Sequence, residues 1–158
     1  MFQIGDKVVH PMYGAGMVDS IVQKKVDGTV RDYYILKLPN RSMVVMVPTD
    51  SSEEIGVRPI VNREQADRVL AAIPSIQVEM TSNWNHRYRE NMERMKSGDL
   101  YEVAWVIKGL TVRDQKRGLS TGERKMLHSA KQILISEIVL ATSQSYEAVE
   151  EELNTALA

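Results

Sequence analysis

The chain has 158 residues, of which 43% are hydrophobic and 26% are charged, a composition that fits a folded globular protein and excludes a largely disordered one. No run of eighteen apolar residues occurs, and the N-terminus lacks the charged-then-apolar layout of a signal peptide. We therefore expect a cytoplasmic protein with no membrane partner. The lack of cysteine excludes disulfides, thiol nucleophiles and thiolate metal sites.

The first sixty residues predict short β-strands, at 7–9, 16–22, 33–38 and 43–47, with a further candidate at 56–60. Each segment is rich in β-branched or aromatic residues and is bounded by turn residues. Asp27 and Gly28 indicate a tight hairpin, because both tolerate the positive φ that such a turn needs. A turn is also expected at 39–42. Several short strands at this spacing are typical of a small barrel or sandwich.

After Val61 the hydrophobic period changes from two to about 3.6, which predicts a helical domain. We place a β domain at 1–60 and a helical domain of about five helices at 61–158. Ser120 and Glu123 form a capping box, in which the hydroxyl and the carboxylate each satisfy an orphan amide at a helix start. The expected helix starts are marked by Asn62, Asp99, Ser120 and Ser145, and a further helix is expected after residues 81–83.

The net charge of −1 conceals a segregation of charge along the chain. Residues 84–131 contain eleven Lys or Arg and six Asp or Glu, whereas residues 132–158 contain five Glu and no Lys or Arg. A local basic patch attracts a phosphate backbone whatever the total charge. The same pattern also describes an ordinary solvated helix surface, and charge alone does not decide between the two.

Both tryptophans lie in the helical half. Trp84 begins a helix and is followed closely by Arg87 and Arg89, a setting that suggests a wedge into nucleic acid. Helical spacing instead favours burial, since it places Trp84 at the end of an apolar stripe with Tyr88, Met92 and Met95. Trp105 falls outside the apolar face of its own helix. By periodicity alone, Trp105 is the more exposed tryptophan.

Three blocks together resemble the CarD and CdnL family of bacterial transcription regulators: FQIGDKVVHPMYGAG at 2–16, NWNHRY at 83–88 and DQKRGLSTGERKML at 114–127. The first block is shared with the polymerase-binding module of transcription-repair coupling factors, so the helical half makes the assignment specific. The resemblance implies an α+β protein, with a small Tudor/SH3-like β-barrel followed by an all-helical domain.

The resemblance also implies a non-enzymatic transcription regulator. Its N-terminal domain would bind the RNA polymerase β subunit, and its helical domain would contact promoter DNA with little sequence preference. The tryptophan matching Trp84 would wedge into the minor groove at the upstream edge of the melted bubble and slow its collapse. We expect a monomer that associates with the nucleoid through polymerase.

The family's contact residues carry over to two sets of positions. The expected polymerase contacts are Lys24, Lys25 and Met46. Met46 stands where many members have an arginine, and Lys25, Arg41 or a neighbouring residue is a candidate to supply the missing positive charge. The expected DNA contacts are Trp84, His86, Arg87, Arg89 and Lys125.

Other function classes are less well supported. One alternative is a Tudor/SH3-like adaptor without direct DNA contact. A Tudor-type reader of modified side chains needs an aromatic cage, but Tyr33 and Tyr34 must point to opposite sheet faces. The histidines show no catalytic or metal-binding spacing, so we predict no enzymatic activity, no metal and no cofactor. They are His10, His86 and His128.

Overall fold

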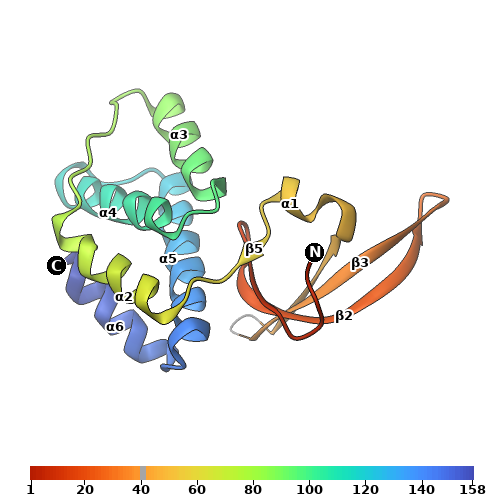
Figure 1. Ribbon diagram of the computed structural model, residues 1–158. Coiled ribbons are helices and arrows are strands. Elements are labelled where there is room, and N and C mark those ends of the chain that lie inside the picture. Colours follow the sequence, from red (N-terminus) through yellow and green to blue (C-terminus); the bar gives the residue numbers. More distant parts are fainter. Residues whose placement is uncertain (40–41) are drawn as a thin grey trace.

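The computed structural model describes residues 1–39 and 42–158, and its elements follow an α+β order (Figure 1). Within these residues five strands form one antiparallel sheet in the order β4-β3-β2-β1-β5. The strands are β1 (Lys7–His10), β2 (Gly14–Val26), β3 (Thr29–Leu38), β4 (Met43–Pro48) and β5 (Arg58–Pro59). The expected class, a small Tudor-like β domain followed by a helical domain, is confirmed.

The helical half contains five α-helices in the described part of the chain, as the hydrophobic period predicts. They are α2 (Arg63–Ala72), α3 (Trp84–Lys96), α4 (Leu100–Arg117), α5 (Thr121–Thr142) and α6 (Tyr146–Leu157), with the 3-10 turn η3 (Ile73–Ser75) after α2. The sequence did not predict the 3-10 turn η2 (Thr49–Ser51) or the four-residue α1 (Ser52–Ile55), which together connect β4 to β5.

Side-chain caps begin these helices, four of them at the residues that the sequence predicts. Asn62 and Gln65 form a capping box at α2, and Ser120 and Glu123 form the predicted one at α5. In each box two backbone amides that no helical carbonyl can reach receive a side-chain acceptor. The remaining caps are Asn83 at α3, Asp99 at α4 and Ser145 at α6.

The β2–β3 hairpin is longer than the sequence predicts, and its strands change register once. Val18 pairs with Leu36, but Ser20 pairs with Ile35, so β2 contains one extra residue between these pairs. Such a β-bulge resets which side chains share a face of the sheet. Beyond it the strands continue to the predicted tight turn at 27–28, where φ is 51° and 80°. Residues 40 and 41 of the turn expected at 39–42 lie outside the described residues.

Two apolar clusters stabilise the protein. The smaller one lies on the inner face of the sheet and is formed by Val8, Val18, Tyr34, Leu36, Val47 and Val57. The larger one fills the space between α2, α3, α4, α5 and α6, and it includes Val9 and Ala15 of the sheet. Because sheet residues belong to the helical core, the two parts pack against each other directly, and β2 contacts α5 (Figure 1).

Polar contacts fix this junction. The carboxylate of Glu137 in α5 is fully buried and accepts two 2.7 Å hydrogen bonds from the guanidinium of Arg58. It also accepts a bond from the amide of Val61 at 2.8 Å. Nearby, Ser136 Oγ accepts a 2.9 Å bond from the amide of Ala15. The orientation of the helices relative to the sheet is therefore set by buried hydrogen bonds as well as by apolar contact.

Among the helices that the structure describes, none combines the length and the apolar character needed to cross a membrane.

Candidate functional site

Trp84 is the first residue of α3, and 42% of its surface is exposed. Its ring stacks on Tyr88, with centroids 5.1 Å apart and planes inclined by 19°. The indole Nε1 donates a 2.9 Å hydrogen bond to Oγ of Ser120, the N-cap of α5. One stack and one hydrogen bond therefore orient the indole, while part of its apolar surface remains open to solvent.

Burial increases along the stripe that begins at Trp84. Tyr88 and Met92 are half-buried, and Met95 is 8% exposed. The burial that periodicity favours thus holds for the end of the stripe and not for its first residue.

The relative exposure of the two tryptophans is the reverse of what periodicity predicts. Trp105 is half-buried, with the guanidinium of Arg94 3.7 Å from its ring centroid.

Arg87 is an internal residue, only 3% exposed. Its Nε and NH2 donate to the Oε2 and Oε1 of Glu123 at 2.7 and 3.2 Å. Its NH1 donates to the carbonyls of Thr81 and Ser82 at 3.0 and 3.2 Å. The expectation that Arg87 contacts DNA phosphate is therefore wrong. Its guanidinium is buried among these acceptors and cannot reach a ligand at the surface.

Glu123 connects this internal arginine to the exposed tryptophan. Its Oε1 accepts a 3.1 Å bond from Oγ of Ser120, the hydroxyl that in turn accepts from Trp84. Burial acts to raise the pKa of Glu123, but hydrogen bonds from Arg87 and Ser120 outweigh it and lower that pKa below its usual 4.5. The ionised carboxylate therefore holds Ser120 in the position that orients the indole.

The capping box is visible in the sequence, but its contact with Trp84 is not. Ser120 and Trp84 are 36 residues apart, and so are Glu123 and Arg87. No local pattern pairs side chains over that distance. Sequence reasoning consequently missed Ser120 and Glu123 as residues that position the candidate site.

Three of the expected DNA contacts besides Trp84 are exposed. His86 and Arg89 lie in the first turns of α3, and Lys125 lies in the first turns of α5. His86 Nε2 is 3.9 Å from a carboxylate oxygen of Glu90. Within residues 1–39 and 42–158, neither Arg89 nor Lys125 forms an ion pair with a carboxylate. Both cations are therefore accessible to an anionic ligand.

Lys24 and Met46 lie on the same face of the sheet, although they belong to different strands. Lys24 pairs with Arg31 and Met46 pairs with Ile35, and these two partners are four residues apart in β3. Cross-strand partners share a face, as do residues an even number apart on one strand. Lys25, the residue after Lys24, points to the opposite face. The structure therefore brings together two of the three expected polymerase contacts and separates the third from them.

The surface that carries Lys24 and Met46, called the outer face below, is apolar for a solvent-facing sheet. Met17 and Val44 lie on it beside Met46, and all three are exposed. Exposed apolar patches of this kind mark contacts with other macromolecules. Arg31 on the same face is paired with Asp50 at 2.6 Å. The other candidate to compensate for Met46, residue 41, lies outside the described residues.

The histidines lie in unrelated places. His10 is 7% exposed, its Nδ1 accepts a 3.1 Å bond from the amide of Met12, and burial lowers its pKa. His86 and His128 are exposed on different helices. In the described part of the chain, no three His, Cys, Asp or Glu side chains are close enough to hold a metal ion.

Comparison with known proteins matches both halves of the chain. The model of the CarD-like/TRCF RID domain matches residues 2–61, and the model of the CarD C-terminal domain matches residues 68–154. A protein of Bacillus subtilis (strain 168) with the name "Putative transcription factor YdeB" is 31% identical over 138 residues. That similarity covers 87% of this chain and 90% of the Bacillus protein.

Proposed function

The chain belongs to the CarD family of transcription regulators, and on that basis we propose that it bridges RNA polymerase and promoter DNA and lengthens the life of the open complex. In this proposal the β domain at 1–60 binds the polymerase β subunit. The helical domain at 61–158 contacts DNA at the upstream edge of the bubble. The observation that carries the proposal is an exposed tryptophan held in one orientation, with exposed cations in the first turns of α3 and α5.

The orientation of Trp84 favours a wedge. Its contacts with Tyr88 and Ser120 order the ring before any ligand arrives, so binding costs less side-chain entropy. An apolar wedge fills the gap at an unstacked base step, and it therefore binds distorted DNA more tightly than relaxed DNA. This difference in affinity shifts the equilibrium toward the melted state. Stacking of an aromatic side chain on a base contributes roughly 1–3 kcal/mol, about a five- to hundredfold change in the open-to-closed ratio.

The exposed cations in the first turns of α3 and α5 would contact the phosphate backbone. Arg89 and Lys125 are exposed and unpaired in the described residues, and the exposed His86 is a third candidate contact. Phosphate contacts fix the position of a protein on DNA without reading its sequence. DNA binding by the isolated protein is accordingly weak, sensitive to salt and tolerant of sequence.

The outer face of the sheet is the proposed polymerase contact. It offers the cation of Lys24 and the flexible apolar side chain of Met46, with Met17 and Val44 beside it. Methionine adapts its shape to irregular apolar surfaces, so the contact does not depend on an arginine at position 46.

The wedge is tested by open-complex lifetime with and without the protein. Trp84→Ala should shorten the lifetime toward that without the protein, while the fold and polymerase binding are retained. Tyr101→Ala is the matched control, because Tyr101 is 41% exposed on α4, close to the 42% of Trp84. Equal lifetimes for the wild type and Trp84→Ala, with polymerase binding intact, would favour the adaptor without direct DNA contact.

The polymerase contact is tested with two neighbouring lysines on opposite faces. Lys24→Glu should weaken the capture of a β-subunit fragment, because it reverses the charge on the outer face. Lys25→Glu makes the same charge change on the other face and should have little effect. If the two variants lose binding equally, the contact involves the hairpin as a whole and not the outer face.

A further inference from the structure

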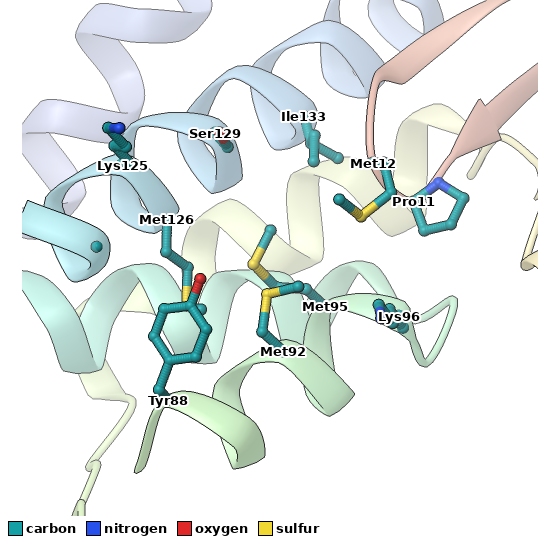
Figure 2. Close-up of a pocket in the computed structure, with 11 residues that line it drawn as sticks. Pro11, Met12, Tyr88, Met92, Met95, Lys96, Lys125, Met126, Ser129 and Ile133 are labelled. Atoms are coloured by element: carbon teal, nitrogen blue, oxygen red, sulfur yellow. The ribbon is translucent and has the colours of Figure 1, made fainter. Parts of the chain in front are cut away.

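A pocket of about 190 Å³ opens between α3, α5 and the turn after β1 (Figure 2). One side of it is lined by Tyr88, the ring on which Trp84 stacks. We propose that this pocket binds a small amphipathic carboxylate, whose apolar body lies among methionines and whose charged end pairs with Lys125.

The walls of the pocket are apolar and adaptable. Figure 2 shows methionine side chains gathered around its centre, from the turn after β1 and from both helices. Methionine has three rotatable bonds and a polarisable sulfur, so such walls fit ligands of irregular shape. The apolar lining residues are Pro11, Met12, Met92, Met95, Met126 and Ile133.

The size of the pocket limits its ligand. A buried apolar cavity of about 150 Å³ holds a benzene molecule, and typical drug-sized sites are larger than about 300 Å³. A pocket of about 190 Å³ therefore matches one aromatic ring with a short arm. A nucleobase fits the walls less well, because its polar edges would meet few hydrogen-bonding partners there.

The polar end of the pocket is defined by two residues of α5. Lys125 and Ser129 both line the pocket and are one helical turn apart, so their side chains lie on the same side of α5. The ammonium group can pair with a carboxylate while the hydroxyl donates to it. Lys96 lies elsewhere on the rim and is well separated from Lys125 in Figure 2. Neither lysine forms an ion pair within the described residues.

A bound carboxylate would compete with DNA, and this step rests on the proposed function. Lys125 is one of the cations placed against the phosphate backbone above. A ligand carboxylate that pairs with Lys125 removes that cation from the DNA contact. The pocket would thereby make DNA association depend on the concentration of a small acid.

Binding is measured on the full chain by NMR of ¹³C-labelled methionine methyl groups, with phenylacetate as the ligand and phenylacetamide as its uncharged counterpart. Phenylacetate should shift the methyl signals of Met92, Met95 and Met126 to a saturating value and bind more tightly than phenylacetamide. Lys125→Gln should remove about two- to fivefold of the affinity for phenylacetate, the range of an exposed ion pair. Lys116→Gln changes an exposed lysine on α4 outside the pocket and should leave the affinity unchanged.

A pocket-filling variant shows where the ligand lies. Ser129→Leu fills the pocket and should abolish the methyl shifts, whereas His128→Leu alters an exposed neighbour on α5 and should not. Equal affinities for phenylacetate and phenylacetamide, shifts that never saturate, or shifts that survive Ser129→Leu would each overturn the site.

The link to DNA is tested separately from the site. Phenylacetate should weaken DNA association by wild-type protein and have no effect on Lys125→Gln. If phenylacetate saturates the pocket but leaves the DNA affinity of the wild type unchanged, competition at Lys125 is overturned while the binding site stands. Failure of the wedge itself is detected independently, by an open-complex lifetime that does not depend on Trp84.

Discussion

Arg87 and Glu123 form a two-point ion pair inside the helical half, with N···O distances of 2.7 and 3.2 Å. The same carboxylate accepts from Ser120, whose hydroxyl accepts from the indole of Trp84. The ion pair is thus connected to the exposed tryptophan through a single residue. It helps to hold the indole in its orientation through Ser120.

Two arginines two positions apart should behave differently when replaced. Arg87→Leu should lower the free energy of unfolding by about 3–5 kcal/mol, because Glu123 is left as a buried charge without its partner. Arg89→Ala should change it by less than about 0.5 kcal/mol, since Arg89 is exposed and unpaired in the described residues. Arg89→Ala should instead reduce the salt slope of DNA association by about 1. Urea unfolding measures the free energy of unfolding, and DNA titrations over a range of salt concentrations measure the salt slope. Similar stability losses in both variants would contradict a structural role for Arg87 and a surface role for Arg89.

The carboxylate of Glu123 should make stability depend on acid pH. Its pKa is lower in the folded protein than its usual 4.5, so the stabilisation is complete above about pH 4.5 and is lost as the pH falls toward the folded pKa. Glu123→Gln removes this contribution. The difference in free energy of unfolding between wild type and Glu123→Gln should be constant near neutral pH and shrink below about pH 4.5. A difference that is the same at pH 7 and at about pH 3.5 would be inconsistent with an ionised, hydrogen-bonded Glu123.

His10 should contribute a second pH dependence in a different range. Burial lowers its pKa below the usual 6.5, and its Nδ1 accepts from the amide of Met12. The unfolded chain therefore takes up a proton first, and stability falls as the pH drops below about 6.5 toward the folded pKa. His10→Asn keeps an acceptor and does not titrate, so its stability should fall less between about pH 6.5 and 5. Identical slopes for the variant and the wild type would exclude His10 as the cause.

The ion pair at the junction should control how the sheet sits against the helices. Arg58→Met leaves the fully buried Glu137 without its charged partner and should cost about 3–5 kcal/mol of unfolding free energy. The radius of gyration from X-ray scattering should rise as the two parts separate. Arg68→Met removes an exposed pair with Glu64 and should cost less than about 1 kcal/mol, with no change in radius. An unchanged radius in Arg58→Met would mean that apolar packing alone holds the junction.

Much of the fold follows from local patterns, and these were predicted well. The caps at Asn62, Asp99, Ser120 and Ser145 depend on bonds to amides two or three residues away, which a sequence displays directly. The tight turn at 27–28 and the change of hydrophobic period after Val61 are local in the same sense. The short α1 was not predicted, since a four-residue helix is too short to show a period.

The site was predicted less completely, because its geometry depends on contacts between distant segments. Arg87 and Arg89 look alike in the sequence, and only the approach of α5 buries the first of them. The same approach supplies Ser120 to Trp84 and leaves the tryptophan half exposed at the end of its stripe. The resemblance to known sequences pointed to Trp84 where periodicity pointed to Trp105, which is covered by Arg94.

The bulge in β2 has a consequence for comparing relatives of this chain. A single extra residue between the pairs at Val18 and Ser20 determines that Lys24, and not Lys25, shares a face with Met46. In a relative that lacks this extra residue, the residue with the same number as Lys24, counted from the N-terminus, would point to the opposite face of the sheet. Equivalent side chains on this hairpin are therefore found by counting back from the turn at 27–28, because a one-residue gap at the bulge shifts the count for every residue that follows it.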